Sequence, residues 1–135
     1  MPMPMRMRTE RWLPLARVAG HSMAPTLTDG DVVATLPTHA RRGDIVVLRR
    51  AGEPTMVKRI VAGAGDVVRL EAGRLSVNGR PLDGPPVSGA YAQTWTVPVG
   101  HWFVVGDNRA VSSDSRTWAQ PFVATSDLRG RVLGH

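Results

Sequence analysis

The chain has 135 residues, enough for one domain whose modest hydrophobic core needs no metal ion or disulfide for support. It contains no cysteine, which excludes disulfides, thiolate zinc sites and a cysteine nucleophile. The net charge of +6 comes from arginines that are scattered singly or in pairs, as is typical of a solvated surface, and we expect no nucleic acid partner.

The beginning of the chain has no continuous apolar core. Proline and arginine interrupt residues 1–20, and no stretch approaches the ~20 apolar residues of a membrane-spanning helix or forms the core of a secretion signal. We therefore expect residues 1–10 to be a disordered tail and residues 11–135 to form a single domain. The same region holds a short apolar patch, predicted to dock on the domain, with contact to a lipid surface as the alternative. The patch consists of Trp12, Leu13, Leu15 and Val18.

Alternating apolar residues and turn signals dominate the rest of the chain. Glycine–aspartate turns at 29–31 and 42–44 precede the first two predicted strands, and Asn78-Gly79 predicts a two-residue hairpin turn. The predicted strands cover residues 32–34, 45–48, 55–62, 66–71, 74–77, 94–97 and 101–105.

Helical periodicity is nearly absent. A single helical turn is expected at 124–128, with Thr125 or Ser126 as its cap. The expected fold class is therefore mostly β, an antiparallel and barrel-like core with little helix.

The first segment that could carry chemistry is GHSMAPTL, residues 20–27. Pro25 keeps the chain before it extended, so Ser22 can present its hydroxyl beside open backbone. Taken alone, the pattern is more typical of an ordinary loop. His21 is disfavoured as the partner base because adjacent side chains on a strand point to opposite faces. The remaining histidines show no metal-ligand spacing, and we expect neither metal nor cofactor.

The second segment contains Lys58, the only lysine of the chain; every other basic side chain is arginine. Strand alternation places Lys58 on one face with apolar Met56, Ile60 and Ala62, while Arg59 takes the other face. Burial lowers the pKa of a lysine, and a general base working near neutrality needs a pKa of about 7–8. The alternative is a lysine whose ammonium group stays in water. It would be present by chance in a sequence biased towards arginine codons. That alternative gives no reason to retain lysine at this position.

The third segment is GDNRAVSSDSR, residues 106–116, directly after an apolar strand. Its short polar side chains are compatible with a surface turn. They also supply a serine hydroxyl, which can orient a neutral lysine without restoring its charge. Either Asp107 or Asp114 could tie the loop down by an ion pair with Arg116.

Four sequence segments together resemble the ordered boxes of type I signal peptidases. They are SMAPTL at 22–27, the arginine-glycine-aspartate turn at 42–44, KRIVAGAGD at 58–66 and GDNRAVSSDSR at 106–116. The resemblance extends over nearly the whole chain. It implies a serine endopeptidase with a serine–lysine dyad that cleaves signal or leader peptides after small residues, in an Ala-x-Ala-like pattern.

The resemblance also implies a role for each matching residue. Ser22 corresponds to the nucleophile and Lys58 to the general base. Ser112 corresponds to the hydroxyl that orients the lysine, and Asp114 with Arg116 to a supporting ion pair. Asp107 is a further supporting residue.

Substrate binding is expected around the serine. A preprotein or leader peptide would bind as an added β-strand, and the Ser22 backbone N–H is the favoured oxyanion donor. The substrate-binding and oxyanion residues are expected to be Gly20, Ser22 and Met23. Some relatives carry a hydroxyl residue at the position of Gly20 as a second donor, so the glycine marks a subgroup.

The absence of a spanning segment indicates a minimal form without a membrane anchor. The resemblance implies a peripheral position at the outer face of the cytoplasmic membrane, in contact with anionic lipid, with a soluble cytoplasmic protein as the alternative. Three other functions remain open: a dedicated soluble maturation protease for one propeptide, as in nickel superoxide dismutase maturation; a self-cleaving repressor-type domain, although no helix-turn-helix is visible; and a non-catalytic basic β-module that binds lipid.

Overall fold

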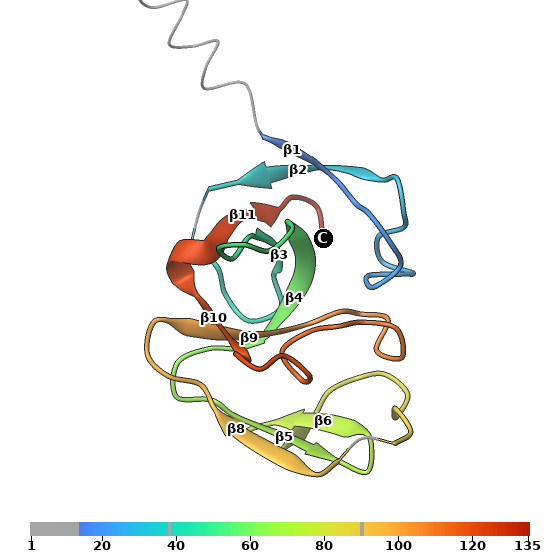
Figure 1. The fold of residues 1–135 in the computed structure, drawn as a ribbon, viewed down its shortest axis with the longest axis vertical. Coiled ribbons are helices and arrows are strands. Elements are labelled where there is room, and N and C mark those ends of the chain that lie inside the picture. The colour runs from blue at the N-terminus through green and yellow to red at the C-terminus, as the bar shows by residue number, and fades with distance from the viewer. Residues whose placement is uncertain (1–13, 38, 90) are drawn as a thin grey trace, which may run out of the picture.

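The computed structural model describes residues 14–37, 39–89 and 91–135. The expected tail at 1–10 lies outside the described residues. So do Trp12 and Leu13 of the predicted apolar patch. The regular secondary structure of the described chain is almost wholly antiparallel strand, which confirms the predicted fold class (Figure 1). The strands are β1 (Leu15–Arg17), β2 (Val32–Leu36), β3 (Ile45–Leu48), β4 (Met56–Ala62), β5 (Val67–Glu71), β6 (Arg74–Val77), β7 (Arg80–Pro81), β8 (Gln93–Thr96), β9 (His101–Val105), β10 (Phe122–Ala124) and β11 (Leu128–Val132).

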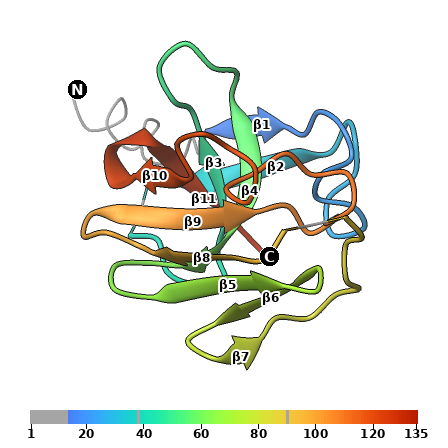
Figure 2. The same cartoon turned by 60° about the horizontal axis from the view of Figure 1, so that its bottom comes forward.

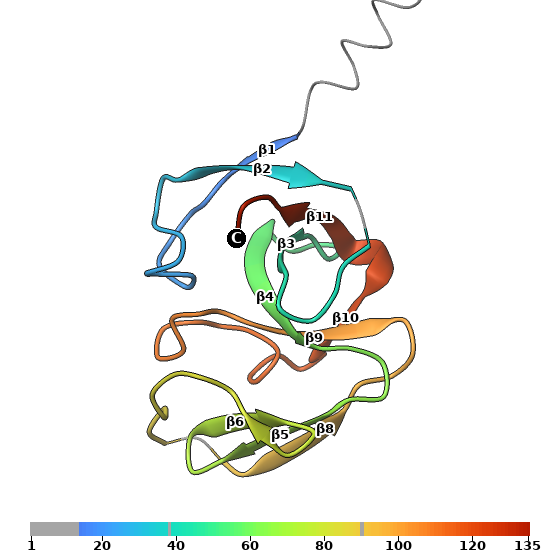
Figure 3. The same ribbon diagram turned by 180° about the vertical axis from the view of Figure 1, so that it is seen from behind.

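The strands form two sheets. The larger has the order β1-β2-β11-β3-β4-β9-β10, and the smaller has the order β7-β6-β5-β8. The views in Figures 1 and 3 show the small sheet lying beside β9 at one end of the larger one. The larger sheet curls strongly, as Figure 2 shows, but the order of the described strands does not close it into a ring. The predicted barrel-like shape therefore holds only in this loose sense.

The hydrophobic core consists of three clusters. One lies between the two sheets, where the rings of Trp95 and Phe103 approach with centroids 4.8 Å apart. The other two lie within the larger sheet, one against each face of β3: Ile45 and Val47 face one cluster, and Val46 and Leu48 face the other. Burial on both faces makes β3 apolar at every position. The central strand β3 is therefore packed on both of its faces.

The turn chemistry is largely as predicted. Asn78 and Gly79 both have positive φ, 52° and 81°, and they join β6 to β7 as a two-residue hairpin turn requires. The expected helical turn is a short 3₁₀ helix, Thr125–Asp127. Its predicted cap is wrong, because Ala124 occupies the N-cap position and no side chain makes the capping hydrogen bond.

β4 carries the lysine and lies near the centre of the larger sheet, between β3 and β9. Lys58 pairs with Val46 of β3 and is buried, whereas Arg59, which points to the other face, is only half-buried. The predicted alternation is therefore present from Met56 to Ile60. It is wrong for Ala62, because a register shift against β9 follows Ile60, and Val61 and Ala62 both pack in the cluster between the two sheets. No helix among the described residues is long and apolar enough to cross a membrane.

Candidate active site

Ser22 lies in a compact turn at 20–27, between β1 and β2. The turn closes through a hydrogen bond from the Ala24 N–H to the His21 carbonyl, 3.1 Å. Gly20 has a φ of +84°, which favours glycine at this position, and its N–H donates to Asp29 Oδ1 at 2.8 Å. Within the described part of the chain, the backbone N–H groups of Ser22 and Met23 have no hydrogen-bond partner. These two donors are available to a ligand, whereas the N–H of Gly20 is occupied.

Ser22 and Lys58 line the same groove. Its volume is about 340 Å³, and it lies between the end of β1 with the residues after it and the beginning of β4 with the residues before it. On one side it is lined by residues 16–19, on the other by residues 54–58. The structure thus brings together the two side chains that the sequence singled out, although they come from distant parts of the chain.

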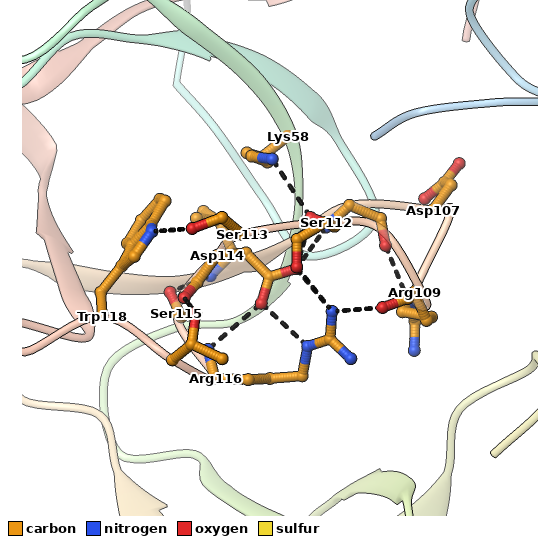
Figure 4. Close-up of polar contacts among 12 residues, drawn as sticks. Lys58, Asp107, Arg109, Ser112, Ser113, Asp114, Ser115, Arg116 and Trp118 are labelled. Carbon is orange, nitrogen blue, oxygen red and sulfur yellow. Dashed lines mark hydrogen bonds and ion pairs between the residues drawn. The ribbon is translucent and has the colours of Figure 1, made fainter. Parts of the chain in front are cut away.

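Lys58 is only 5% exposed, and its Nζ donates to the Ser112 hydroxyl at 3.1 Å, as Figure 4 shows. Burial lowers the pKa of Lys58 below the ordinary value for lysine. The Asp114 carboxylate opposes this shift in the pKa, and the positive charge of Arg116 adds to it. Among the described residues, no hydrogen bond joins Lys58 to Ser22.

The Ser112 hydroxyl is held in one orientation. It donates its hydrogen to Asp114 Oδ2 at 2.6 Å and accepts hydrogen bonds from Lys58 Nζ and from the Gly106 N–H. Because its only hydrogen points to Asp114, the hydroxyl can act towards Lys58 only as an acceptor. One N–H of the lysine is therefore fixed on Ser112, and the rest of the Nζ group faces away from it.

Asp114 is fully buried and paired with Arg116, whose Nε lies 2.8 Å from Oδ1 and whose second contact reaches Oδ2 at 3.0 Å (Figure 4). Such a two-point contact between guanidinium and carboxylate is the strong form of ion pair. Arg116 also donates to the carbonyl oxygens of Arg109 and Ser112. Of the two aspartates considered from sequence, Asp114 is the partner of Arg116. Through these contacts Arg116 links residues 109, 112 and 114 of the loop.

Asp107 has a different partner, Arg59, which the sequence did not suggest. Arg59 Nε and a terminal nitrogen each lie 2.8 Å from the carboxylate, and the Thr26 hydroxyl donates to it at 2.6 Å. Burial alone would raise the pKa of Asp107, but the hydrogen bonds from Arg59 and Thr26 outweigh this and lower it. Asp107 therefore joins the serine turn to β4, and its N–H also contacts the sulfur of buried Met23 at 3.4 Å.

Gly106 separates the serine turn from the lysine's partner. A Cβ at this position would lie 2.3 Å from Ser112 Oγ and 2.5 Å from the carbonyl oxygen of Ser22. Both distances are far inside van der Waals contact, so only glycine allows the two segments to approach this closely. Gly106 was noted in the sequence only as the start of a polar loop.

The chain is similar to several known signal peptidases. Signal peptidase I of Pseudomonas aeruginosa is 30% identical over 167 residues, covering 86% of this chain and 58% of that protein. Signal peptidase I of Leptolyngbya laminosa is also 30% identical, covering 86% of this chain and 64% of that protein. For signal peptidase I of Streptococcus pneumoniae serotype 4, the identity is 31%, with coverage of 74% and 71%.

A solved structure shows the same relation. The crystal structure of a signal peptidase I from Enterococcus faecalis V583 superposes with a TM-score of 0.57 and 27% identity, covering 70% of this chain and 97% of that one. This chain spans about three fifths of the length of the P. aeruginosa and L. laminosa proteins. The family described as signal peptidase, peptidase S26, matches residues 7–134, and the chain belongs to this family.

Proposed function

We propose that this protein is a serine endopeptidase that cleaves signal or leader peptides after small residues, with Ser22 as nucleophile and Lys58 as general base. The observation that carries the proposal is a single buried lysine, bound to a serine hydroxyl, in the groove that holds a second serine. Membership of the peptidase family supports the same chemistry. We further propose that Ser112 orients Lys58 and that Asp114, Arg116 and Asp107 hold the loops that position both.

The reaction follows from the orientation of the lysine. Neutral Lys58 takes the hydroxyl proton of Ser22 while Ser22 Oγ bonds to the carbonyl carbon of the substrate, whose oxygen becomes negative. Lys58 then gives this proton to the leaving nitrogen, the C–N bond breaks and an acyl-enzyme remains. A water molecule then gives a proton to Lys58 and attacks the ester carbonyl. The bond from this carbon to Ser22 Oγ breaks, the acyl part leaves as an acid, and Lys58 returns the proton to Ser22. The first proton transfer requires Ser22 Oγ to come within hydrogen-bond distance of Lys58 Nζ.

The substrate would lie in the groove as an extended strand. The chain on either side of the groove, residues 16–19 and 54–58, offers backbone to such a strand. The unpaired N–H groups of Ser22 and Met23 would receive the developing oxyanion. Gly20 borders this site, but its N–H is held by Asp29, so its contribution is the backbone conformation and not a hydrogen bond.

Cleavage of a peptide with an Ala-x-Ala sequence tests the proposal directly. We expect turnover by the wild-type chain, none by Ser22→Ala, and covalent labelling of Ser22 by a fluorophosphonate, detected by mass spectrometry. A chain that neither cleaves nor becomes labelled would instead be a binding module. Equal activity of the wild type and Ser22→Ala would also refute the assignment.

We predict that kcat rises with pH on a limb set by Lys58. The folded pKa of this lysine is lowered, so its neutral, active form appears at lower pH than for a free lysine and is lost as pH falls through that pKa. The measurement is kcat against pH between about 5 and 10. An imidazole base would instead give a limb near about 6.5. His21→Asn is the control and should retain the profile.

We also propose that the protein lies peripherally at the outer face of the cytoplasmic membrane. Leu15 is 70% exposed and Val32 is 55% exposed. They share one face of the β1–β2 pair with Arg17, because Arg17 and Val32 are directly paired and Leu15 lies two residues before Arg17. Apolar groups with nearby positive charge fit an anionic lipid surface, to which each arginine adds about 1 kcal/mol.

Vesicle sedimentation tests this position. We expect weak binding to vesicles containing anionic lipid, weaker at high salt and lost when Leu15 and Val32 are both replaced by serine. Val99→Ser is the control, since Val99 is an even more exposed apolar residue (86%) but lies in the turn before β9 and not on the β1–β2 pair. Protein that stays in the supernatant even at low salt would favour the dedicated soluble maturation protease.

A further inference from the structure

Asn108 contacts both peptide groups that flank Ser22. Its side-chain Nδ2 donates to the carbonyl oxygen of His21 at 3.1 Å. Its backbone N–H donates to the carbonyl oxygen of Ser22 at 2.8 Å. A single residue of the polar loop thus holds the peptide before the nucleophile and the peptide after it.

The first of these contacts helps to set the direction of the Ser22 N–H. The His21–Ser22 peptide is trans, and in a planar trans peptide the N–H and the C=O point in opposite directions. Anchoring the His21 carbonyl on Asn108 therefore turns the Ser22 N–H away from the loop. That N–H has no partner among the described residues. A hydrogen bond to the carbonyl also polarises the peptide and strengthens its N–H as a donor.

The orientation of the Ser22 N–H matters more in this chain because Gly20 offers no hydrogen-bond donor to an oxyanion. Gly20 carries no hydroxyl, and its N–H is already bound to Asp29. The oxyanion would therefore depend on the Ser22 and Met23 N–H groups, whose peptides are both oriented through the carbonyls that Asn108 holds.

We infer that Asn108 is a positioning residue of the oxyanion hole, which holds the carbonyls of His21 and Ser22 so that the N–H groups behind them point to the reacting carbonyl. The inference rests on the proposed peptidase function. It assigns no contact with substrate to Asn108 itself. The Ala24 N–H also donates to the His21 carbonyl, so the side chain of Asn108 refines an orientation that the turn partly sets.

The test uses the full chain with Asn108→Asp and Asn108→Ser. Both remove the Nδ2 donor and keep the backbone N–H, and Asp preserves the size of the side chain. Loss of a whole oxyanion donor lowers kcat by about 100- to 1,000-fold. Since the Ala24 contact remains, we expect a fall in kcat of about 10- to 100-fold with KM within about twofold of the wild type. Val111→Ala, at an exposed position of the same loop, is the matched control.

A peptide aldehyde separates positioning from a general structural role. Its adduct with Ser22 places a tetrahedral oxygen in the oxyanion hole, so its Ki should rise by the same factor by which kcat/KM falls. An uncleavable peptide of the same sequence should bind all variants equally, and their melting temperatures should stay above the assay temperature. Wild-type kcat and aldehyde affinity in Asn108→Asp, or an equal loss of affinity for both ligands, would overturn the inference. Equal inactivity of wild type and Ser22→Ala would instead show that the peptidase proposal itself fails.

Discussion

Lys58→Arg should abolish peptide cleavage, lowering kcat/KM by about 10⁴-fold or more, the scale on which loss of a catalytic dyad member acts. Arginine keeps the positive charge and much of the volume but does not deprotonate in proteins. The proposed mechanism needs a neutral nitrogen that can take the Ser22 proton, so charge alone cannot substitute. Steady-state cleavage of an Ala-x-Ala peptide measures the effect. Ser22→Ala should match it, and Ser112→Ala should lose less activity because its hydroxyl only orients the lysine.

Lys58→Met shows whether such a loss reflects chemistry or folding. The pKa of Lys58 is lower in the folded chain than in the unfolded one, so the unfolded state binds more protons between these two pKa values. The lysine therefore destabilises the fold below its folded pKa, and this effect disappears as pH rises towards the unfolded value of about 10.4. An inactive Lys58→Met protein should be more resistant to urea than the wild type, with a larger difference at pH 6 than at pH 10. Lower stability at both pH values would mean that the lysine is structural.

The sequence alone was enough to predict the residues whose chemistry is unusual for their surroundings. Lys58 stands in an apolar strand of a chain that otherwise uses arginine, and the structure buries it beside Ser112. The alternation of β4 follows from residue types two positions apart, so local pattern was sufficient. Asp114 and Arg116 are two residues apart, and their pairing required only that the loop turn back on itself.

Contacts between distant segments could not be predicted in the same way. Asp107 was a candidate partner for Arg116 but binds Arg59, because its position after β9 faces the opposite side of β4. Nothing in the local sequence distinguishes these two arginines. The role of Asn108 likewise depends on how the serine turn lies against the loop, which only the folded chain shows.

Three strands of the larger sheet, β1, β10 and β11, were not predicted from the sequence, and each omission has a physical reason. β1 and β10 are the two edges of the larger sheet and have only three residues each, too few for a clear alternation. β11 contains two arginines and Gly130, a composition typical of a loop. Gly130 lies at a register shift and so close to Thr35 that a Cβ would come within 2.9 Å of its side chain. Glycine inside a strand often marks such a close approach.

Gly106→Ala should lower kcat by about 100-fold or more. The added Cβ would overlap both Ser112 Oγ and the Ser22 carbonyl oxygen, so the two segments must move apart. Ser112 carries the hydrogen bond that orients Lys58, and Ser22 carries the proposed nucleophile. A displacement of about 1 Å between reacting groups can cost about 100-fold in rate. Cleavage kinetics measure the loss, and circular dichroism checks the fold.

Gly130→Ala is the matched control for this prediction. Neither glycine has a positive φ, and in both the added Cβ meets a neighbouring side chain at less than 3.0 Å, so both substitutions crowd a packed segment. Only Gly106 lies between the nucleophile and the partner of the base. We expect both variants to lose stability to urea, but Gly130→Ala to keep a kcat close to that of the wild type. If the two variants lost activity in proportion to their stability, Gly106 would have no part in setting the separation of Ser22 and Lys58.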